Sequence, residues 1–241
     1  MRLDVYLVQE GFFPSRQKAR SAIDAGWVTV NGKAAAKAGV EITPKDVIEI
    51  KAHDLLKYVS AGGFKLEKAI REFQLDFKGK TVLDVGASTG GFTDCALQHG
   101  ASKVYTVDVG SDQLSPRLKQ DPRVIWKEQT HVKDFTLAEN VDIVVMDVSF
   151  ISQVQVYPFV KNWLKEDGWL ITLIKPQFEL DRKVSFRGGI VRDEKLHQAV
   201  LDKIKLAAKN EGFILKGLTS APENEHKNKE FLAWFIYRCG V

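Results

Sequence analysis

From Gly63 onward, segments with the apolar pattern of buried strands alternate with segments of helical periodicity. Alternation of this kind is typical of a parallel β-sheet that is covered by helices on both faces. The expected strands are TVLDV (81–85), KVYTVDV (103–109), RVIWK (123–127), VDIVVMDV (141–148), WLITLIK (169–175), FILKGLTS (213–220) and EFLAWFIYR (230–238). The expected helices span 63–73, 90–99, 111–119, 151–165 and 194–210. No helix separates the last two strands, so we expect them to form an antiparallel pair at one edge of the sheet.

The first fifty residues read as a separate, smaller α+β unit. Leu3 and Leu7 have helical spacing, and Ser15 is placed to cap a second helix. The Asn31-Gly32 pair that follows a short apolar strand is a strong signal for a hairpin turn. The stretch KAHDLLKYVS that comes next looks like a linker. The sequence therefore predicts a domain over 1–52, a linker over 53–61 and a larger domain over 62–241.

Basic side chains gather on the second expected helix. Arg16, Lys18 and Arg20 lie there, and Arg2 opens the first helix. Such a cluster is either a solvated helix face or a surface that meets phosphates, and these residues alone favour neither reading. The net charge of the chain is only +4, which permits nucleic-acid binding without requiring it.

Several classes of protein are disfavoured by what the chain lacks. Cys95 and Cys239 lie far apart in the sequence, which favours reduced thiols and a cytoplasmic location. The five histidines have no His or Cys partners at ligand spacing, so no metal site is expected. No secretory signal opens the chain, and no apolar run approaches the roughly 20 residues of a membrane helix, so no membrane partner is expected.

A glycine-rich turn follows the first expected strand of the larger domain, in VLDVGASTGGFTD (82–94). The spacing Gly86-x-x-x-Gly90-Gly91 differs from the G-x-G-x-x-G of dinucleotide enzymes, and the Gly-Lys-Ser/Thr of a P-loop is absent. Asp84 before the turn would repel a pyrophosphate but suits a ligand that carries an amino group, and Asp108 at the next strand end can accept both hydroxyls of a ribose. S-adenosylmethionine has both features. A dinucleotide cofactor and a bare helix-packing turn are the competing interpretations.

Two more polar side chains end expected strands: Asp147 follows VDIVVM, and Lys175 follows WLITLI. The carboxyl ends of parallel strands line the ligand crevice of an open sheet, so Asp84, Asp108, Asp147 and Lys175 are expected to face one cleft. A lysine at the end of a buried strand costs desolvation energy unless it is paired or used. Lys65, at the start of the helix before the sheet, and Glu230, at the start of the last strand, are placed to join them.

The order of motifs in the chain resembles two known families. Arg2-Leu3-Asp4, Ser15-Arg16 and Gly26-x-Val28-x-Val30-Asn31-Gly32 are similar to the alpha-L motif, a small RNA-binding module of ribosomal proteins. GGFKLEKA, VLDVGASTGGFTD, MDVSFIS, LIKPQFE, GGIVRD and NKEFLAWF together resemble the TlyA family, which is historically labelled hemolysin A and is similar to FtsJ-like ribose 2'-O-methyltransferases of ribosomal RNA. The resemblance implies a Rossmann-like methyltransferase sheet of seven strands, the last one antiparallel, preceded by a small α+β RNA-binding domain.

The resemblance also implies a set of catalytic residues. The Lys-Asp-Lys-Glu tetrad of the family falls on Lys65, Asp147, Lys175 and Glu230. Glu223 and Glu225 lie close by in the sequence, and Glu230 is chosen because it stands in the Asn-Lys-Glu-Phe pattern of the family. Ala61 stands where the family has an arginine, which removes one contact to an RNA phosphate.

Two further groups of residues follow from the loop and from the resemblance. The residues expected to bind S-adenosylmethionine are Asp84, Gly86, Ala87, Ser88, Thr89, Gly90, Gly91, Phe92, Thr93, Asp108 and Asp147. The residues expected to bind ribosomal RNA, on free RNA or on a ribosomal subunit, are Arg2, Ser15, Arg16, Lys18, Arg20, Asn31, Lys33, Arg182 and Arg187. Arg182 and Arg187 belong to the long connection 176–193, which we expect to close over RNA.

The chemistry of a ribose 2'-O-methyl transfer suggests a role for each member of the tetrad. The hydroxyl must lose its proton as it attacks a sulfonium methyl group. Two neighbouring lysines depress each other's pKa, so that one of them can be neutral near pH 7 and act as a base. We expect Lys175 to be this base and Lys65 to hold a phosphate or the developing alkoxide, while Asp147 and Glu230 orient them, although the two lysines can also share the proton.

Other functions remain as alternatives to a methyltransferase that modifies ribosomal RNA at cytidine. A membrane-lytic hemolysin is the older label of the family, but the sequence shows no strongly amphipathic basic helix. An RNA-binding protein on a catalytically dead methyltransferase fold is the third alternative, and the intact loop and tetrad argue against it. The sequence leaves open the modified nucleotide, the ribosomal subunit and the oligomeric state.

Overall fold

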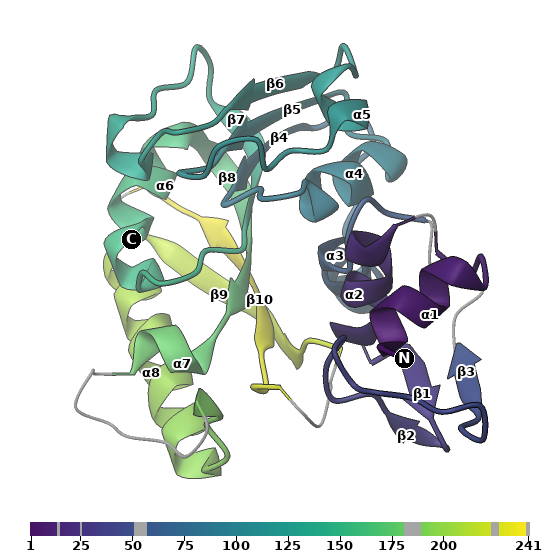
Figure 1. Ribbon diagram of the computed structural model, residues 1–241. Helices are drawn as coiled ribbons and strands as arrows, with labels where there is room; N and C mark the ends of the chain where they lie inside the picture. The colour runs from purple at the N-terminus through teal and green to yellow at the C-terminus, as the bar shows by residue number, and fades with distance from the viewer. Residues whose placement is uncertain (14, 25, 51–56, 181–188, 223–226, 240–241) are drawn as a thin grey trace.

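The protein consists of a small N-terminal domain and a larger α/β domain, as seen in a computed structural model (Figure 1). The structure describes residues 1–239 except 14, 25, 51–56, 181–188 and 223–226. Within this part of the chain, no helix is long and apolar enough to cross a membrane.

The N-terminal domain packs two helices against a small antiparallel sheet with the strand order β2-β1-β3. Its elements are α1 (Leu3–Gln9), α2 (Arg16–Asp24), β1 (Val28–Val30), β2 (Lys33–Ala34) and β3 (Ile48–Ile50). Asn31 adopts φ 53° in the turn between β1 and β2, and its side chain donates to Asp46 and accepts from the Val47 amide. The expected hairpin is therefore present, and Asn31 stabilises it locally.

The larger domain is built on a seven-stranded sheet with the order β6-β5-β4-β7-β8-β10-β9. Its strands are β4 (Thr81–Val85), β5 (Lys103–Val107), β6 (Val124–Lys127), β7 (Val141–Met146), β8 (Leu164–Ile174), β9 (Phe213–Ser220) and β10 (Phe231–Tyr237). Neighbours from β6 to β8 pair in parallel, whereas β10 is antiparallel to both β8 and β9. The predicted Rossmann-like sheet with an antiparallel last strand is confirmed.

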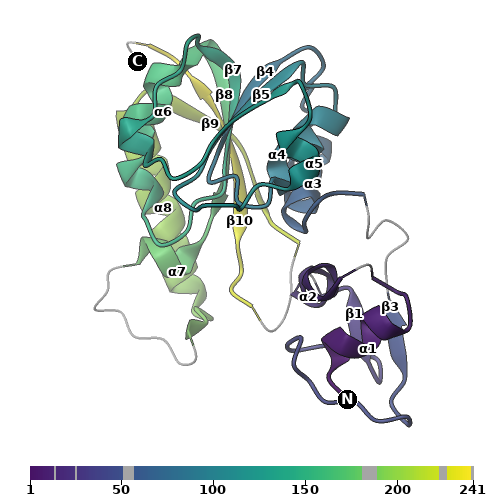
Figure 2. The same ribbon diagram turned by 45° about the horizontal axis from the view of Figure 1, so that its top comes forward.

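Helices cover both faces of this sheet, as Figures 1 and 2 show. The helices and short 3-10 turns are α3 (Gly62–Phe73), α4 (Gly91–Gln98), α5 (Pro116–Lys119), η1 (Val132–Asp134), η2 (Gln153–Gln155), α6 (Tyr157–Trp163), α7 (Pro176–Glu179) and α8 (Glu194–Asn210). Helices α3, α4 and α5 lie on one face, and α6 and α8 lie on the other. Each face has its own apolar core, centred on Leu66 and Val82 on the first side and on Val144 and Ile204 on the second.

Two of the expected helices are shorter than predicted. Only residues 116–119 of the segment 111–119 are helical, because the amides of Asp112, Gln113 and Leu114 bond to the Glu128 carboxylate instead of continuing a helix. The segment 151–165 forms the 3-10 turn η2 and the helix α6, and α6 ends at Trp163 because buried Leu164 already pairs with β7 and begins β8.

The N-terminal domain contacts the α/β domain on the side of α3. The ammonium of Lys18 on α2 donates to the carbonyl oxygens of Tyr58 and Val59, at 3.1 and 2.6 Å. Both of these residues are buried in the core of the larger domain, so the C-terminal part of the expected linker 53–61 is packed against it. The Trp27 ring meets the Phe64 ring edge-on, with 4.5 Å between the ring centroids.

Candidate functional site

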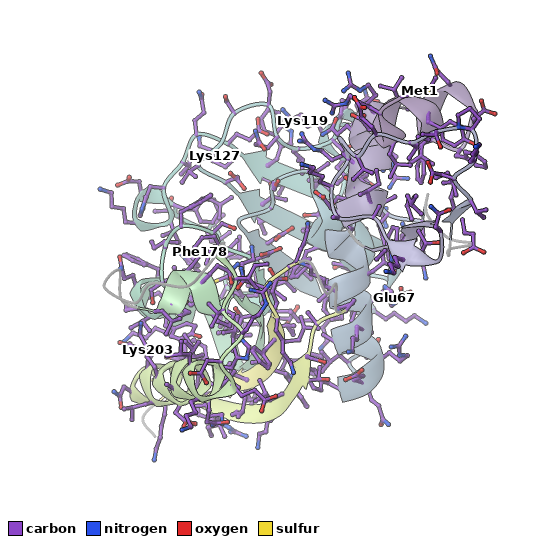
Figure 3. All side chains as sticks on the ribbon, turned by 60° about the horizontal axis from the view of Figure 1, so that its bottom comes forward. Met1, Glu67, Lys119, Lys127, Phe178 and Lys203 are labelled. Atoms are coloured by element: carbon purple, nitrogen blue, oxygen red, sulfur yellow. The ribbon has the colours of Figure 1, made fainter. Side chains whose placement is uncertain are left out.

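A pocket of about 900 Å³ opens where the carboxyl ends of β4, β7 and β8 meet the start of β10 and the N-terminus of α3. Part of its wall comes from the N-terminal domain, through Ser21, Asp24 and Trp27. Figure 3 shows side chains filling the region between α3, where Glu67 is labelled, and α7, where Phe178 is labelled. All four residues of the predicted tetrad line this pocket.

The glycine loop after β4 forms the floor of the pocket. Gly86 has φ +80°, and a Cβ atom there would lie 2.8 Å from the carbonyl oxygen of Asp147. Gly90 has φ +93°, and a Cβ atom there would overlap Leu118 of α5. Left-handed backbone at both positions, together with the close contacts, explains why this turn requires glycine.

Close approach of two helix N-termini brings α3 to the same loop. A Cβ atom on Gly91 would lie 2.8 Å from the Gly63 amide nitrogen and 2.4 Å from the Ser60 hydroxyl. Likewise, a Cβ atom on Gly63 would overlap the ring of Tyr58. Small residues at these contacts let the first turn of α3, and with it Lys65, border the pocket.

Asp84 is a fully buried carboxylate at the end of β4. Its Oδ2 accepts from the amide and the hydroxyl of Thr93, at 3.0 and 2.6 Å, whereas Oδ1 has no hydrogen-bond partner in the described structure. Burial raises the pKa of Asp84 to about 7, against the effect of the Thr93 bonds. A buried acceptor that borders a pocket and lacks a donor fits a ligand with an ammonium group.

Most residues expected to bind the cofactor lie at this floor. The pocket-lining members of that set are Asp84, Gly86, Ala87, Ser88, Thr89, Gly91, Phe92 and Asp147. Thr93 lies behind the floor, where it holds Asp84, and Gly90 packs on α5.

Asp108 follows β5, next to the glycine loop. Its two carboxylate oxygens accept from the amides of Ser88 and Gly110, both at 2.7 Å. The residue fixes the shape of the loop, and each oxygen keeps a second lone pair that can accept a ligand hydroxyl.

Lys175 lies at the junction of β8 and α7, where Pro176 begins the helix. Its ammonium forms an ion pair with Asp147 and donates to the Ser149 hydroxyl at 2.8 Å. Only 12% of the side chain is exposed. The lysine that ends a buried strand is therefore paired, and Ser149 is a neighbour that the sequence reasoning missed, although it stands in the quoted motif MDVSFIS.

Lys65 and Glu230 form the second ion pair of the pocket, with 2.6 Å between Nζ and Oε2. Burial lowers the pKa of Lys65, but the charges of Asp147 and Glu230 outweigh it, so the pKa lies above that of an ordinary lysine. The nearby carboxylates, rather than the second lysine, therefore dominate the pKa of Lys65 and keep it charged, as expected for the member of the pair that is not the base.

The residues expected to bind RNA have different environments. Arg2 and Arg16 both bond to the buried carboxylate of Asp4, which lowers its pKa, and their side chains stay half exposed. Lys18 is engaged by the backbone of the other domain. Ser15 caps α2 by accepting from the Lys18 amide, and Asn31 holds the hairpin turn.

The remaining basic residues of that set divide into two groups. Arg20 and Lys33 are exposed on the N-terminal domain. Arg182 and Arg187 lie outside the described residues, as do Glu223 and Glu225. Among the described residues, no group of three or more His, Cys, Asp or Glu side chains could hold a metal ion.

Comparison with known families gives two matches along the chain. The family of FtsJ-like methyltransferases matches residues 58–237, and the S4 domain family matches residues 1–48.

Individual relatives cover nearly the whole chain. Hemolysin A of Brachyspira hyodysenteriae is 43% identical over 98% of this chain and 100% of its own length. The 16S/23S rRNA (cytidine-2'-O)-methyltransferase TlyA of Mycobacterium tuberculosis strain H37Rv is 34% identical over 97% of this chain and 88% of its own. The solved structure of a candidate hemolysin from Streptococcus thermophilus has a TM-score of 0.76 at 39% identity, over 99% of this chain and 89% of that one.

Proposed function

The chain belongs to the TlyA family of FtsJ-like methyltransferases, and from this premise we propose that it methylates a ribose 2'-hydroxyl of ribosomal RNA with S-adenosylmethionine as the methyl donor. The observation that carries the proposal is the meeting of Lys65, Asp147, Lys175 and Glu230 in one pocket, directly above a glycine loop. A relative with this architecture is named for cytidine 2'-O-methylation of ribosomal RNA, and we extend that substrate to this chain.

The floor of the pocket fits S-adenosylmethionine. The unpartnered Oδ1 of Asp84 is placed to accept from its ammonium group, and the glycine loop lets the backbone approach it closely. Asp108 has lone pairs left for the ribose hydroxyls. When bound, the cofactor supplies a methyl group on a positively charged sulfur. The protein supplies the position of the attacking hydroxyl and takes up its proton.

Lys175 is our candidate for the base. Asp147 and Ser149 hold its nitrogen in one orientation, and as the neutral amine it would accept the proton that leaves the 2'-hydroxyl. Lys65 is the candidate for the cation that stabilises the developing alkoxide or an adjacent phosphate, because its raised pKa keeps it charged at neutral pH. Glu230 pairs with Lys65, whereas Asp147 pairs with Lys175 and also acts on Lys65 through its charge.

The N-terminal domain would provide the grip on structured RNA. S4 domain membership supports this role, and Arg20 and Lys33 are exposed basic side chains that can contact phosphates. We place the reaction in the cytoplasm, on ribosomal subunits or on their free RNA.

Transfer of a labelled methyl group tests the proposal. Purified protein is incubated with labelled S-adenosylmethionine and ribosomal subunits from cells that lack the gene, and the methylated riboses are mapped. We expect label on the 2'-oxygen of a cytidine. Binding of the cofactor without transfer to any ribosomal RNA would leave a non-catalytic RNA-binding protein as the better description. Lysis of lipid vesicles by the purified protein alone would support the hemolysin label instead.

A further inference from the structure

One wall of the pocket carries side chains that the methyl transfer itself does not use. Trp27 comes from the N-terminal domain, and Lys68 and Arg71 come from α3. Because Lys65, Lys68 and Arg71 are spaced three residues apart, they follow one another along the helix surface that borders the pocket. The three side chains lead from Lys65, whose side chain is only 25% exposed, outward to the exposed Arg71.

Lys68 and Arg71, the two cations farther along α3, form at most weak ion pairs within the protein. Lys68 faces Glu72 at 3.6 Å within the same helix, an arrangement that contributes little in water. Among the described residues, Arg71 forms no ion pair within 4 Å. Both groups are therefore available to phosphates at the mouth of the pocket.

Trp27 is held in place by other aromatic rings. Its indole packs edge-on against Phe64, at an interplanar angle of 80°, and Phe64 packs in the same manner on the buried ring of Tyr58. Trp27 remains partly exposed in the pocket, and the ring it contacts, Phe64, belongs to the residue that precedes Lys65. A rigid, partly exposed aromatic side chain beside a catalytic lysine is well placed to stack on a nucleobase.

Cationic groups that follow a backbone, combined with an aromatic ring that stacks on bases, are how proteins hold unpaired nucleic-acid strands. A paired A-form strand keeps its base faces inside the helix and cannot use such a ring. We infer that Trp27, Lys68 and Arg71 form the groove for the unpaired RNA strand that carries the target ribose, with one nucleobase stacked on the Trp27 indole. This inference rests on the proposed function and adds that the substrate is unpaired at the site of methylation.

Binding of a labelled oligocytidylate to the full-length protein tests the groove, both as a single strand and annealed to oligoguanylate. We expect the single strand to bind more tightly than the duplex. Trp27→Ala should weaken single-strand binding roughly 10- to 100-fold, the range for loss of one stacked base. Trp27→Phe should keep most of the affinity, whereas Trp27→Leu, which retains apolar contact with Phe64, should not.

The salt dependence of binding separates the two kinds of contact. Lys68→Gln and Arg71→Gln should each reduce the slope of log Kd against log salt by about 0.7, whereas Trp27→Ala should leave the slope unchanged. Lys209→Gln on α8 and Trp126→Ala on β6 are matched controls, because both residues are exposed and lie outside the pocket. Variants are compared only when their affinity for S-adenosylmethionine and their unfolding temperature match those of the wild type.

Several outcomes would overturn the inference. The inference is wrong if the duplex and the single strand bind equally well, or if Trp27→Ala keeps full affinity. It is also wrong if Trp27→Leu binds as well as Trp27→Phe. In each case Trp27 would serve only as a contact between the domains. Methyl transfer to ribosomal RNA is measured in the same variants. If the wild type transfers methyl groups and Trp27→Ala does so equally well, only the groove is refuted. If the wild type binds the cofactor normally but transfers no methyl group, the proposed function is refuted.

Discussion

Lys65 and Glu230 lie 165 residues apart in the chain, and their side chains meet at 2.6 Å in the pocket that the glycine loop also lines. The pair joins the first helix of the α/β domain to the start of its last strand. Because the carboxylates around Lys65 raise its pKa, the lysine stays charged across the physiological range. The four catalytic candidates are thus two ion pairs, in which one lysine is held as a cation and the other is oriented toward the pocket.

Lys175→Ala is expected to lower the rate of methyl transfer by about 10²- to 10⁴-fold, the usual contribution of a general base. S-adenosylmethionine binding should remain mostly intact, because its expected contacts are in the glycine loop. Single-turnover transfer and a cofactor titration measure the two effects separately. Lys209→Ala, which changes an exposed lysine on α8, is the control. Undiminished transfer by Lys175→Ala would exclude Lys175 as the base.

Glu230→Gln should shift the pH dependence of transfer at alkaline pH. The raised pKa of Lys65 means that its charge, and the interaction with Glu230, persist below about pH 10.5 and are lost as the pH rises through the higher folded value. Removal of the carboxylate charge lowers this pKa, so the rate of the variant should begin to fall at a lower pH than that of the wild type. Rate profiles between about pH 7 and pH 11 test this. Identical alkaline limbs would show that Lys65 is not needed as a cation.

The raised pKa of Asp84 predicts that cofactor binding depends on pH. With a folded pKa of about 7, the carboxylate must lose its proton to pair with the ammonium group of S-adenosylmethionine, so the affinity should fall about tenfold for each pH unit below 7. Calorimetry at pH 6 in buffers of different ionisation enthalpy should detect a released proton. The analogue methylthioadenosine, which lacks the amino acid group, serves as the control and should show no such dependence.

The stability of the unliganded protein should also depend on the protonation of Asp84. Between the unfolded pKa of about 3.9 and the folded value of about 7, the folded state retains a proton that the unfolded state has lost. The contribution of Asp84 to stability therefore decreases as the pH rises through this window and is constant above it. Asp84→Asn should remove this component from the unfolding free energy measured between pH 4 and pH 8. An unchanged profile in Asp84→Asn would contradict the raised pKa.

Gly86→Ala separates backbone strain from steric contact. The left-handed conformation alone costs roughly 1–2 kcal/mol for alanine, and the new Cβ atom would also displace the carbonyl group of Asp147. Gly32→Ala is the matched control, because Gly32 has φ +78° with no neighbouring atoms within 4 Å. We expect similar destabilisation from strain in both variants, but weakened cofactor binding and lost transfer only in Gly86→Ala. Denaturant unfolding and a cofactor titration check both.

The meeting of polar strand ends in one pocket could be predicted from the sequence, because the strand ends of a parallel sheet are set by topology. Asp147 and Lys175 could be placed at one crevice from the apolar runs that precede them, and the family resemblance added Lys65 and Glu230. Contacts between the domains leave no such periodic signal. Trp27 therefore could not be assigned to the pocket, and Lys18 could not be recognised as a donor to the backbone near residue 58.

Placement of β10 between β8 and β9 has a consequence for synthesis of the protein. Glu230 precedes this strand directly, and the strand follows all others of the sheet in the chain. During translation, Lys65 emerges long before its partner and cannot be fixed until β10 has left the ribosome and inserted between its neighbours. The pocket is therefore complete only when the sheet closes, because the last strand to be synthesised is the one that brings Glu230 to Lys65.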